Sequence, residues 1–234
     1  MEEQQFRPLT VEREWTADGV PVLTASVSLP EPAVRGNHAM RRIGWFYRLE
    51  MRSYLRYCQT MLFPKAAELC RQALENSAPQ PRCTAALSYR VTYASDGLWS
   101  LSADAREQFG GHTRILRRGD TWNLLTGYPM PLAEFFPPRF PVRKFLLKRA
   151  EAEIVRQEEA GIARYHDSWR QELRRAFSRE NFYLTPEELC FFWQMQVIAP
   201  AVEGIPTFLV PYGEECRLPV LSPHRQKKRR RDSE

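Results

Sequence analysis

The sequence predicts an α+β fold in which an antiparallel sheet, connected as a meander, packs against a long helix and is preceded by an N-terminal strand-helix segment. Two patterns predict this fold. Apolar and polar residues alternate along several short stretches, whereas two longer stretches repeat their apolar residues at steps of three and four. With 43% hydrophobic and 26% charged residues, a chain of 234 residues can bury its own core. Disorder is excluded for most of the chain.

The N-terminal segment combines one strand with a helical stretch. Residues 23–29 alternate with period two, and Pro30 ends the strand. Residues 41–62 then place apolar side chains opposite arginines, which predicts an amphipathic helix. Pro64 fits either the first turn of a second helix over 65–75 or a kink in one long helix, because proline lacks a donor but has a helical φ.

The central stretch alternates again and predicts an antiparallel meander. Asp96 and Gly97 tolerate the left-handed backbone that a tight hairpin needs. Gly119 and Asp120 suggest a second hairpin by the same reasoning. The predicted strands cover residues 85–93, 99–105, 112–117 and 121–125.

The longest helical pattern runs over residues 147–177, with Gly161 as a candidate division between two helices. Its apolar stripe includes Ile154 and Ile162. We expect this stripe to cover the sheet face that carries Leu101. The long helix would then form the main hydrophobic core with that sheet.

Three short stretches predict the closing strands: residues 182–184, 189–198 and 207–210. Between the first two, Thr185 to Glu188 also matches a helix start with a capping box. A turn is the preferred interpretation, because the apolar run that follows is aromatic-rich and alternates.

The positive charge is concentrated at the C-terminus. The formal net charge is +6, with 34 basic and 28 acidic residues, but the last eleven residues hold six basic and two acidic ones, so the rest carries +2. The tail is either a flexible solubilising end or a weak, non-specific contact for anions, nucleic acid or anionic lipid. Its basic residues are Arg225, Lys227, Lys228, Arg229, Arg230 and Arg231. The predicted organisation is a strand-helix segment over 1–80, an α+β domain over 81–221 and a disordered basic tail over 222–234.

Cysteine and histidine spacing predicts neither a disulfide framework nor a metal site. Five cysteines lie at irregular spacings of 12 or more, and four histidines lack a second ligand at a spacing such as HExxH. We expect free thiols, and no cofactor is indicated. No secretory leader or apolar window of about 18 residues occurs, which predicts a cytoplasmic location for the sequence as given, or an extracytoplasmic one if an export segment is missing.

The triplet Gly110, Gly111 and His112 is the one place where permissive backbone adjoins an ionisable ring. It is either a ligand loop, with glycine amides as donors and the imidazole as acid, base or anchor, or a bend whose histidine bonds to backbone. The motifs GxSxG, GxGxxG and the Walker loop are absent from the sequence, so the common signatures of hydrolases, dinucleotide enzymes and NTPases are missing.

From Ser88 onward, six short motifs occur in a known order: SYRVTYASDGLWSLS, GGHT, TWNLLTG, the long helix, NFYLT and IAPAVEGIPTFLVPY. Over about residues 84 to 213 they resemble the domain of unknown function shared by the anti-sigma factor RsiV and the peptidoglycan deacetylase PdaC. The resemblance implies an α+β fold and extracytoplasmic binding work. The residues that match the family's motifs are Gly110, Gly111, His112, Asn123, Gly127, Asn181, Phe182, Tyr183, Pro200, Glu203 and Gly204.

The leading functional hypothesis is a non-enzymatic binding module, a stand-alone RsiV/PdaC-like member without a membrane anchor, that recognises a protein or cell-envelope ligand. Its predicted ligand-binding residues are Gly110, Gly111, His112, Pro200, Glu203 and Gly204. The alternatives are a hydrolase that uses His112 and a weak anion or nucleic-acid binder that acts through the tail. An enzyme needs a concave pocket where His112 meets a second ionisable group, whereas a binding module needs an exposed, partly apolar patch.

Overall fold

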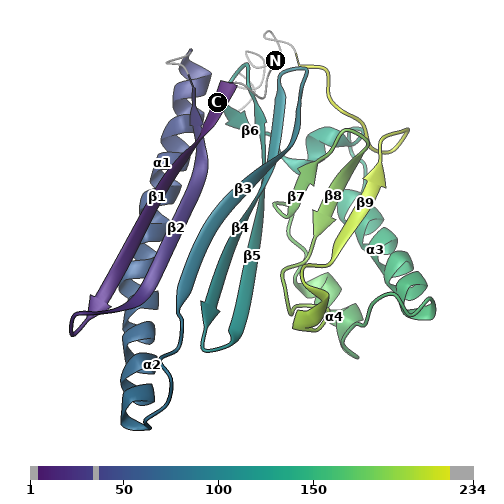
Figure 1. The fold of residues 1–234 in the computed structure, drawn as a ribbon. Coiled ribbons are helices and arrows are strands. Elements are labelled where there is room, and N and C mark those ends of the chain that lie inside the picture. Colours follow the sequence, from purple (N-terminus) through teal and green to yellow (C-terminus); the bar gives the residue numbers. More distant parts are fainter. Residues whose placement is uncertain (1–4, 34–36, 222–234) are drawn as a thin grey trace, which may run out of the picture.

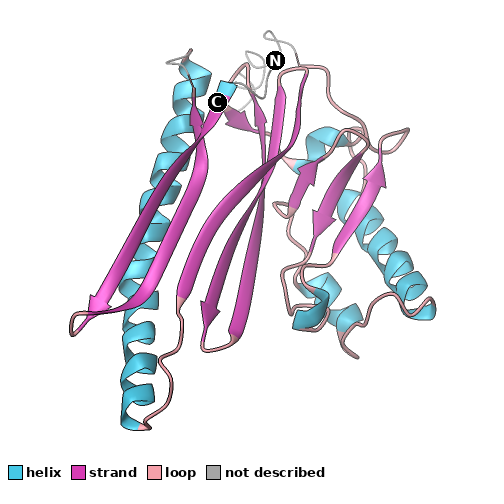
Figure 2. Ribbon diagram, viewed as in Figure 1, coloured by secondary structure: helices cyan, strands magenta, loops and turns pink. Residues whose placement is uncertain are grey.

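The computed structural model describes residues 5–33 and 37–221, and it forms two halves that each place a helix on a sheet (Figures 1 and 2). The predicted basic tail lies outside the described residues. The strands are β1 (Phe6–Ala17), β2 (Val20–Pro32), β3 (Thr84–Ser95), β4 (Leu98–Phe109), β5 (His112–Asn123), β6 (Tyr128–Pro129), β7 (Phe182–Leu184), β8 (Glu188–Phe192) and β9 (Thr207–Pro211). The helices are α1 (His38–Tyr57), α2 (Phe63–Glu75), α3 (Val142–Glu159) and α4 (Trp169–Arg175), with shorter turns η2 (Cys58–Leu62), η3 (Leu132–Phe135) and η4 (Ala201–Glu203). The predicted α+β class is confirmed.

The N-terminal half is built on a six-stranded sheet of order β1-β2-β3-β4-β5-β6. Its neighbours are antiparallel except β2 and β3, which pair in parallel because α1 and α2 cross between them. The sheet therefore takes strands from both sides of the expected boundary at residue 80. Sequence reasoning missed β1, an edge strand in which Phe6 alone is buried. So little burial leaves a weak alternating pattern.

The helical stretch 38–75 combines the two alternatives at Pro64. The chain stays helical throughout, but the π-helical turn η2 separates α1 from α2, and Pro64 lies in the first turn of α2. The amide of Phe63 donates to the carbonyl of Cys58, a five-residue step. This wider turn changes the hydrogen-bond register just before the residue that has no amide hydrogen.

The expected hairpin at Gly119 and Asp120 is wrong, because β5 runs through both residues without a break. The turn lies instead at Gly110 and Gly111, whose φ angles are 52° and 86° and which close a two-residue hairpin between β4 and β5. Gly119 has another role. A Cβ atom there would lie 1.8 Å from the carbonyl oxygen of Phe182, so the missing side chain lets β7 approach β5.

The predicted partner of the long helix is also wrong. Leu101 is fully buried, but it shares its core with Tyr47 of α1, so α1 covers the six-stranded sheet. Ile154 is fully buried against the second sheet, to which α3 belongs. Gly161, with φ 66°, lies just past the end of α3, and Ile162 beyond it is 62% exposed rather than part of the stripe. Periodicity identifies an apolar face but not the sheet that it covers.

The C-terminal half consists of the three-stranded sheet β7-β8-β9 with α3 and α4. The predicted turn at Thr185 is confirmed, since its amide donates to the carbonyl of Glu188 at 2.9 Å. The strand β8 ends at Phe192, earlier than predicted, because the chain then turns toward the first sheet. There the Gln194 side chain accepts from the amide of Arg117 at 2.9 Å and donates to its carbonyl at 2.6 Å.

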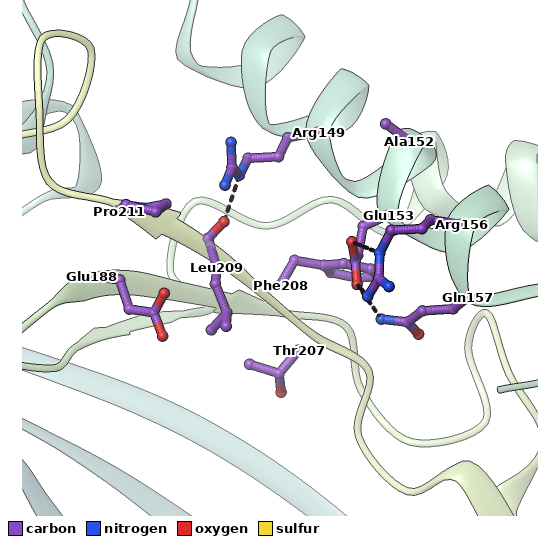
Figure 3. Close-up of a pocket in the computed structure, with 10 residues that line it drawn as sticks. All are labelled: Arg149, Ala152, Glu153, Arg156, Gln157, Glu188, Thr207, Phe208, Leu209 and Pro211. Atoms are coloured by element: carbon purple, nitrogen blue, oxygen red, sulfur yellow. Dashed lines mark hydrogen bonds and ion pairs between the residues drawn. The ribbon is translucent and has the colours of Figure 1, made fainter. Parts of the chain in front are cut away.

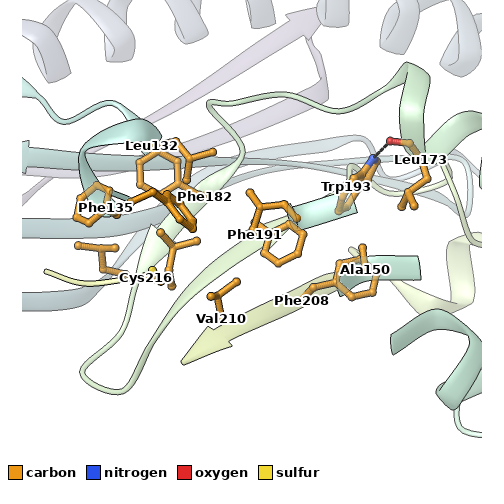
Figure 4. Close-up of a cluster of buried hydrophobic side chains, with 14 of the residues drawn as sticks. Leu132, Phe135, Ala150, Leu173, Phe182, Phe191, Trp193, Phe208, Val210 and Cys216 are labelled. Carbon is orange, nitrogen blue, oxygen red and sulfur yellow. Dashed lines mark hydrogen bonds between the residues drawn. The ribbon is translucent and has the colours of Figure 1, made fainter. Parts of the chain in front are cut away.

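The C-terminal core is dense and aromatic (Figure 4). The indole nitrogen of Trp193 donates to the carbonyl of Leu173 at 3.1 Å, which ties β8 to α4. Phe191 and Phe208 pack around the same indole, with ring centroids 5.7 and 5.5 Å from it. These contacts hold the sheet, and hence its edge strand β9, in a fixed position beside α3.

Candidate binding groove

A groove of about 520 Å³ lies between α3 and the edge strand β9 (Figure 3). Its lining residues are Arg149, Ala152, Glu153, Arg156, Gln157, Glu188, Thr207, Phe208, Leu209 and Pro211. The α3 side of the groove is charged, and the β9 side offers an exposed strand. Backbone and charged groups therefore meet in one concave surface.

The pairing of β8 with β9 fixes which backbone groups of β9 face the groove. Tyr212 donates to the carbonyl of Glu187 and Trp193 to that of Pro206, so every second pair between these positions is hydrogen-bonded. The amides and carbonyls of Thr207 and Leu209 consequently point away from β8, toward the open edge. The edge has backbone groups available for another strand.

Two features partly cover this edge. The guanidinium Nε of Arg149 donates to the carbonyl oxygen of Leu209. Pro211 lacks an amide hydrogen, so the strand offers no donor at its end. Covering groups of this kind are common on sheet edges because they prevent unwanted pairing. The Arg149 side chain is exposed, so it is a removable cover.

The α3 wall is an ordered network of charged and polar groups. Arg156 donates two hydrogen bonds, of 2.8 and 2.6 Å, to the carboxylate of Glu153, and Gln157 donates a third of 2.7 Å. These hydrogen bonds, led by those from Arg156, lower the pKa of Glu153 to about 2. Glu153 therefore keeps its negative charge at neutral pH and holds Arg156 in place.

The loop at Pro200, Glu203 and Gly204, predicted as a ligand site, contacts the segment that follows α3. Glu203 accepts from the amide of Arg164 at 3.1 Å, just beyond α3. The hydroxyl of Tyr165 donates to Gln157 at 2.7 Å. Burial, and then the charges of Glu153 and Glu203, raise the pKa of Tyr165 to about 12. Glu203 thus contacts the segment that follows α3, but neither Glu203 nor its loop neighbours Pro200 and Gly204, which flank η4, line the groove.

The other predicted loop lies on a different half. Gly110, Gly111 and His112 form the turn between β4 and β5, and His112 is exposed. Within residues 5–33 and 37–221, the His112 side chain forms neither a hydrogen bond nor an ion pair. It does not line the groove. The turn at Gly110 to His112 is therefore separate from the groove.

Several residues that match the family's motifs have structural explanations. The side-chain oxygen of Asn123 accepts from the amides of Leu125 and Thr126 and so fixes the turn after β5. A Cβ atom on Gly127 would lie 2.6 Å from the backbone of Ala39, so glycine allows that turn to touch the start of α1. Neither residue lines the groove.

Sequence reasoning missed the groove itself. Arg149 and Glu153 resemble solvated surface on a helix, and Leu209 resembles part of an ordinary closing strand. Pro211 was the available signal, because proline within a strand favours an edge position. The position of α3 beside that edge depends on tertiary packing, which the sequence pattern does not show.

The cysteines and acidic clusters show no metal chemistry in the described part of the chain. All five cysteines, Cys58, Cys70, Cys83, Cys190 and Cys216, are buried free thiols. In residues 5–33 and 37–221, no group of three or more His, Cys, Asp or Glu side chains is placed to hold a metal ion. None of the helices in these ranges has the length and apolar character needed to cross a membrane.

Comparisons with known proteins give a family match and a fold match. No curated protein matches the sequence. Two solved structures of the DUF3298 family are similar: one from Bacteroides fragilis, with TM-score 0.63 and 14% identity, and one from Pseudomonas aeruginosa, with TM-score 0.55 and 16% identity. Each covers 88% of this chain and 90% of its own. At such low identities the structural similarity shows a shared fold alone. Residues 133–213, which include α3, the second sheet and the groove, match the family described as Protein of unknown function (DUF3298).

Proposed function

We propose that the protein is a non-enzymatic binding module that takes an extended segment of a protein partner along the open edge of β9. The observation that carries this proposal is the groove between β9 and α3, where the backbone groups of Thr207 and Leu209 face outward. An added strand can hydrogen-bond to such an edge whatever its sequence, and neighbouring pockets then select its side chains.

The surroundings of the edge supply the selectivity. Leu209 is 44% exposed and offers an apolar contact to a bound side chain. Binding at the carbonyl of Leu209 requires Arg149 to leave it, and the freed guanidinium can then pair with a carboxylate of the partner. Partner segments with one apolar and one acidic residue should therefore bind best.

The resemblance to the RsiV/PdaC-like domain supports the same class of function, because it implies ligand recognition without chemistry in this domain. The loop at Pro200, Glu203 and Gly204, which contacts the segment after α3 through Glu203, remains a predicted contact, as does the separate turn at Gly110, Gly111 and His112. Recognition of a protein or cell-envelope ligand, and anion contact through the basic tail, likewise remain predictions.

The hydrolase alternative has less support. It required a concave site where His112 meets a second ionisable group, and His112 is instead exposed at a hairpin turn. A general acid or base needs a fixed partner and a substrate within hydrogen-bond reach. The binding hypothesis is therefore the one that the geometry favours.

The proposal is tested with peptides selected from a random displayed library against the full chain. Selected peptides should bind wild-type protein but not the Leu209→Pro variant, because proline removes the outward amide at the centre of the edge. That amide does not bond to β8, so the substitution leaves the ladder intact.

Leu209→Ala is the matched control, since it removes the same apolar side chain but keeps the amide. If Leu209→Ala and Leu209→Pro weaken binding equally, the side chain rather than the strand edge is responsible, and strand addition is wrong. If neither variant changes binding, the groove is not the site.

A further inference from the structure

The side of α1 that faces away from the sheet carries arginines around an exposed tryptophan. Residues three, four and seven apart share a face of a helix. On this helix that face consists of Arg41, Trp45, Arg48, Leu49, Arg52 and Arg56, all of them exposed. We refer to these six residues as the α1 outer face.

This surface is apolar as well as charged. Trp45 is 64% exposed and Leu49 is 37% exposed, one helical turn apart. The opposite side of the helix buries Ile43 and Tyr47 on the six-stranded sheet. Figure 1 shows α1 along the outside of that sheet, away from the C-terminal half. Among the described residues, protein therefore covers the inner side of the helix and leaves the outer face exposed.

The positive charges of this face are largely uncompensated. Within residues 5–33 and 37–221, Arg41, Arg52 and Arg56 form no ion pair, whereas Arg48 lies 3.1 Å from Glu31. The one acidic residue in the sequence of α1, Glu50, is turned toward the sheet and pairs with Arg118. The α1 outer face thus has a strong positive charge with no acidic residue in it.

We propose that the α1 outer face docks the protein on an anionic lipid bilayer. Arginines attract anionic headgroups, and tryptophan favours the boundary between headgroups and acyl chains. A helix with a basic and aromatic face lies in the plane of such a surface. Trp45 and Leu49 favour lipid over a duplex nucleic acid, because a phosphate backbone attracts the arginines alone.

The test is sedimentation of the full chain with vesicles of phosphatidylcholine, with and without phosphatidylglycerol. Binding should require the anionic lipid. The double variant Arg52→Glu with Arg56→Glu should weaken that binding by at least about 25-fold, because each basic residue near an anionic surface contributes about a fivefold factor. Both positions are exposed, so the fold is kept.

The matched control is Arg164→Glu with Arg179→Glu. It makes the same change of charge on exposed arginines of the C-terminal half that form no ion pair with another described residue, and it keeps the same tail. Its vesicle binding should equal that of the wild type. Equal losses in both double variants would attribute binding to net charge or to the tail and would overturn the proposal.

Trp45→Ala tests the apolar contribution separately. With brominated lipid in the anionic vesicles, quenching of tryptophan fluorescence should be clear for the wild type and reduced for this variant. Quenching that is unchanged in Trp45→Ala contradicts insertion of the α1 outer face. Binding of the full chain to single-stranded RNA, without binding to the anionic vesicles, would also overturn the proposal.

Discussion

The two halves of the protein both pack a helix on a sheet, but they fix the helix by different means. In the N-terminal half, Tyr47 of α1 donates to the Asp120 carboxylate at 3.0 Å and accepts from the indole of Trp122 at 2.8 Å. Arg118 bonds to the same carboxylate and to Glu50. In the C-terminal half, α3 buries Ala150 and Ile154 among aromatic rings. The helix α1 thus adds directional polar contacts to its apolar packing, whereas α3 is held mainly by apolar packing.

This difference matches the surfaces that each half presents. The polar contacts fix the rotation of α1, which turns Trp45 and its neighbouring arginines outward. The apolar packing fixes α3 beside β9 and so defines the width of the groove. Each helix therefore positions one of the two proposed binding surfaces.

Truncation of a buried side chain in either hydrophobic core should lower stability most. Ile154→Ala and Leu101→Ala should each lower the free energy of unfolding by about 2–5 kcal/mol, because both side chains are fully buried. Denaturant unfolding measures the loss. Ile162→Ala is the matched control, since Ile162 is 62% exposed, and it should change stability little. A small effect at Ile154 would contradict apolar packing as the support of α3.

Blocking the close approach of the two halves at Gly119 should lower stability by the next largest amount. Gly119→Ala should destabilise the protein by about 3 kcal/mol, because its Cβ would collide with the backbone of Phe182. Gly213→Ala, with open space around its Cβ, should be close to neutral in the same thermal unfolding experiment. Equal stability of the two variants would show that the two sheets do not meet at Gly119.

Removing one polar contact of α1 should have a smaller effect. Tyr47→Phe leaves Asp120 and the indole of Trp122 without their shared hydroxyl and should cost about 1–3 kcal/mol. Tyr128→Phe, at a residue that is 45% exposed, is the control and should cost less than about 0.5 kcal/mol. If both variants unfold at the same denaturant concentration as the wild type, the polar contacts do not fix α1.

The smallest expected effect is the dependence of stability on pH. It has opposite signs for one carboxyl group in each half. Burial raises the pKa of Asp120 above 3.8, so its contribution to stability is full below that value and is lost as pH rises through the raised pKa. Glu153 behaves oppositely. Its contribution is present above pH 4.5 and is lost as pH falls to about 2. Carboxyl NMR titration should find these two shifts, and a lowered pKa at Asp120 would contradict the account.

Most helices and strands could be predicted from the sequence, but the elements against which each one packs could not. Period two and period 3.6 located strands and helices, and burial of Leu101 and Ile154 followed from the same patterns. Which helix covers which sheet depends on contacts between distant residues, so Ile154 was assigned to the wrong core. The close approach at Gly119 is likewise invisible in sequence, where a glycine followed by aspartate resembles a turn.

The candidate site shows the same limit. Motif resemblance predicts the loop at Glu203, whereas Arg149 and Leu209 come together only through the packing of α3 beside β9. An exposed strand edge has no side-chain signature of its own, because its functional groups are backbone amides and carbonyls. Pro211 alone indicated an edge.

The most direct test of the proposed function is amide hydrogen exchange of the full chain, measured with and without a selected peptide. Strand addition predicts that the amides of Thr207 and Leu209 exchange more slowly in the complex, because they donate to the added strand. The amides of Gly110 to His112 should be unaffected. Slower exchange at Gly110 to His112, with Thr207 and Leu209 unchanged, would contradict the account and place recognition at the turn between β4 and β5.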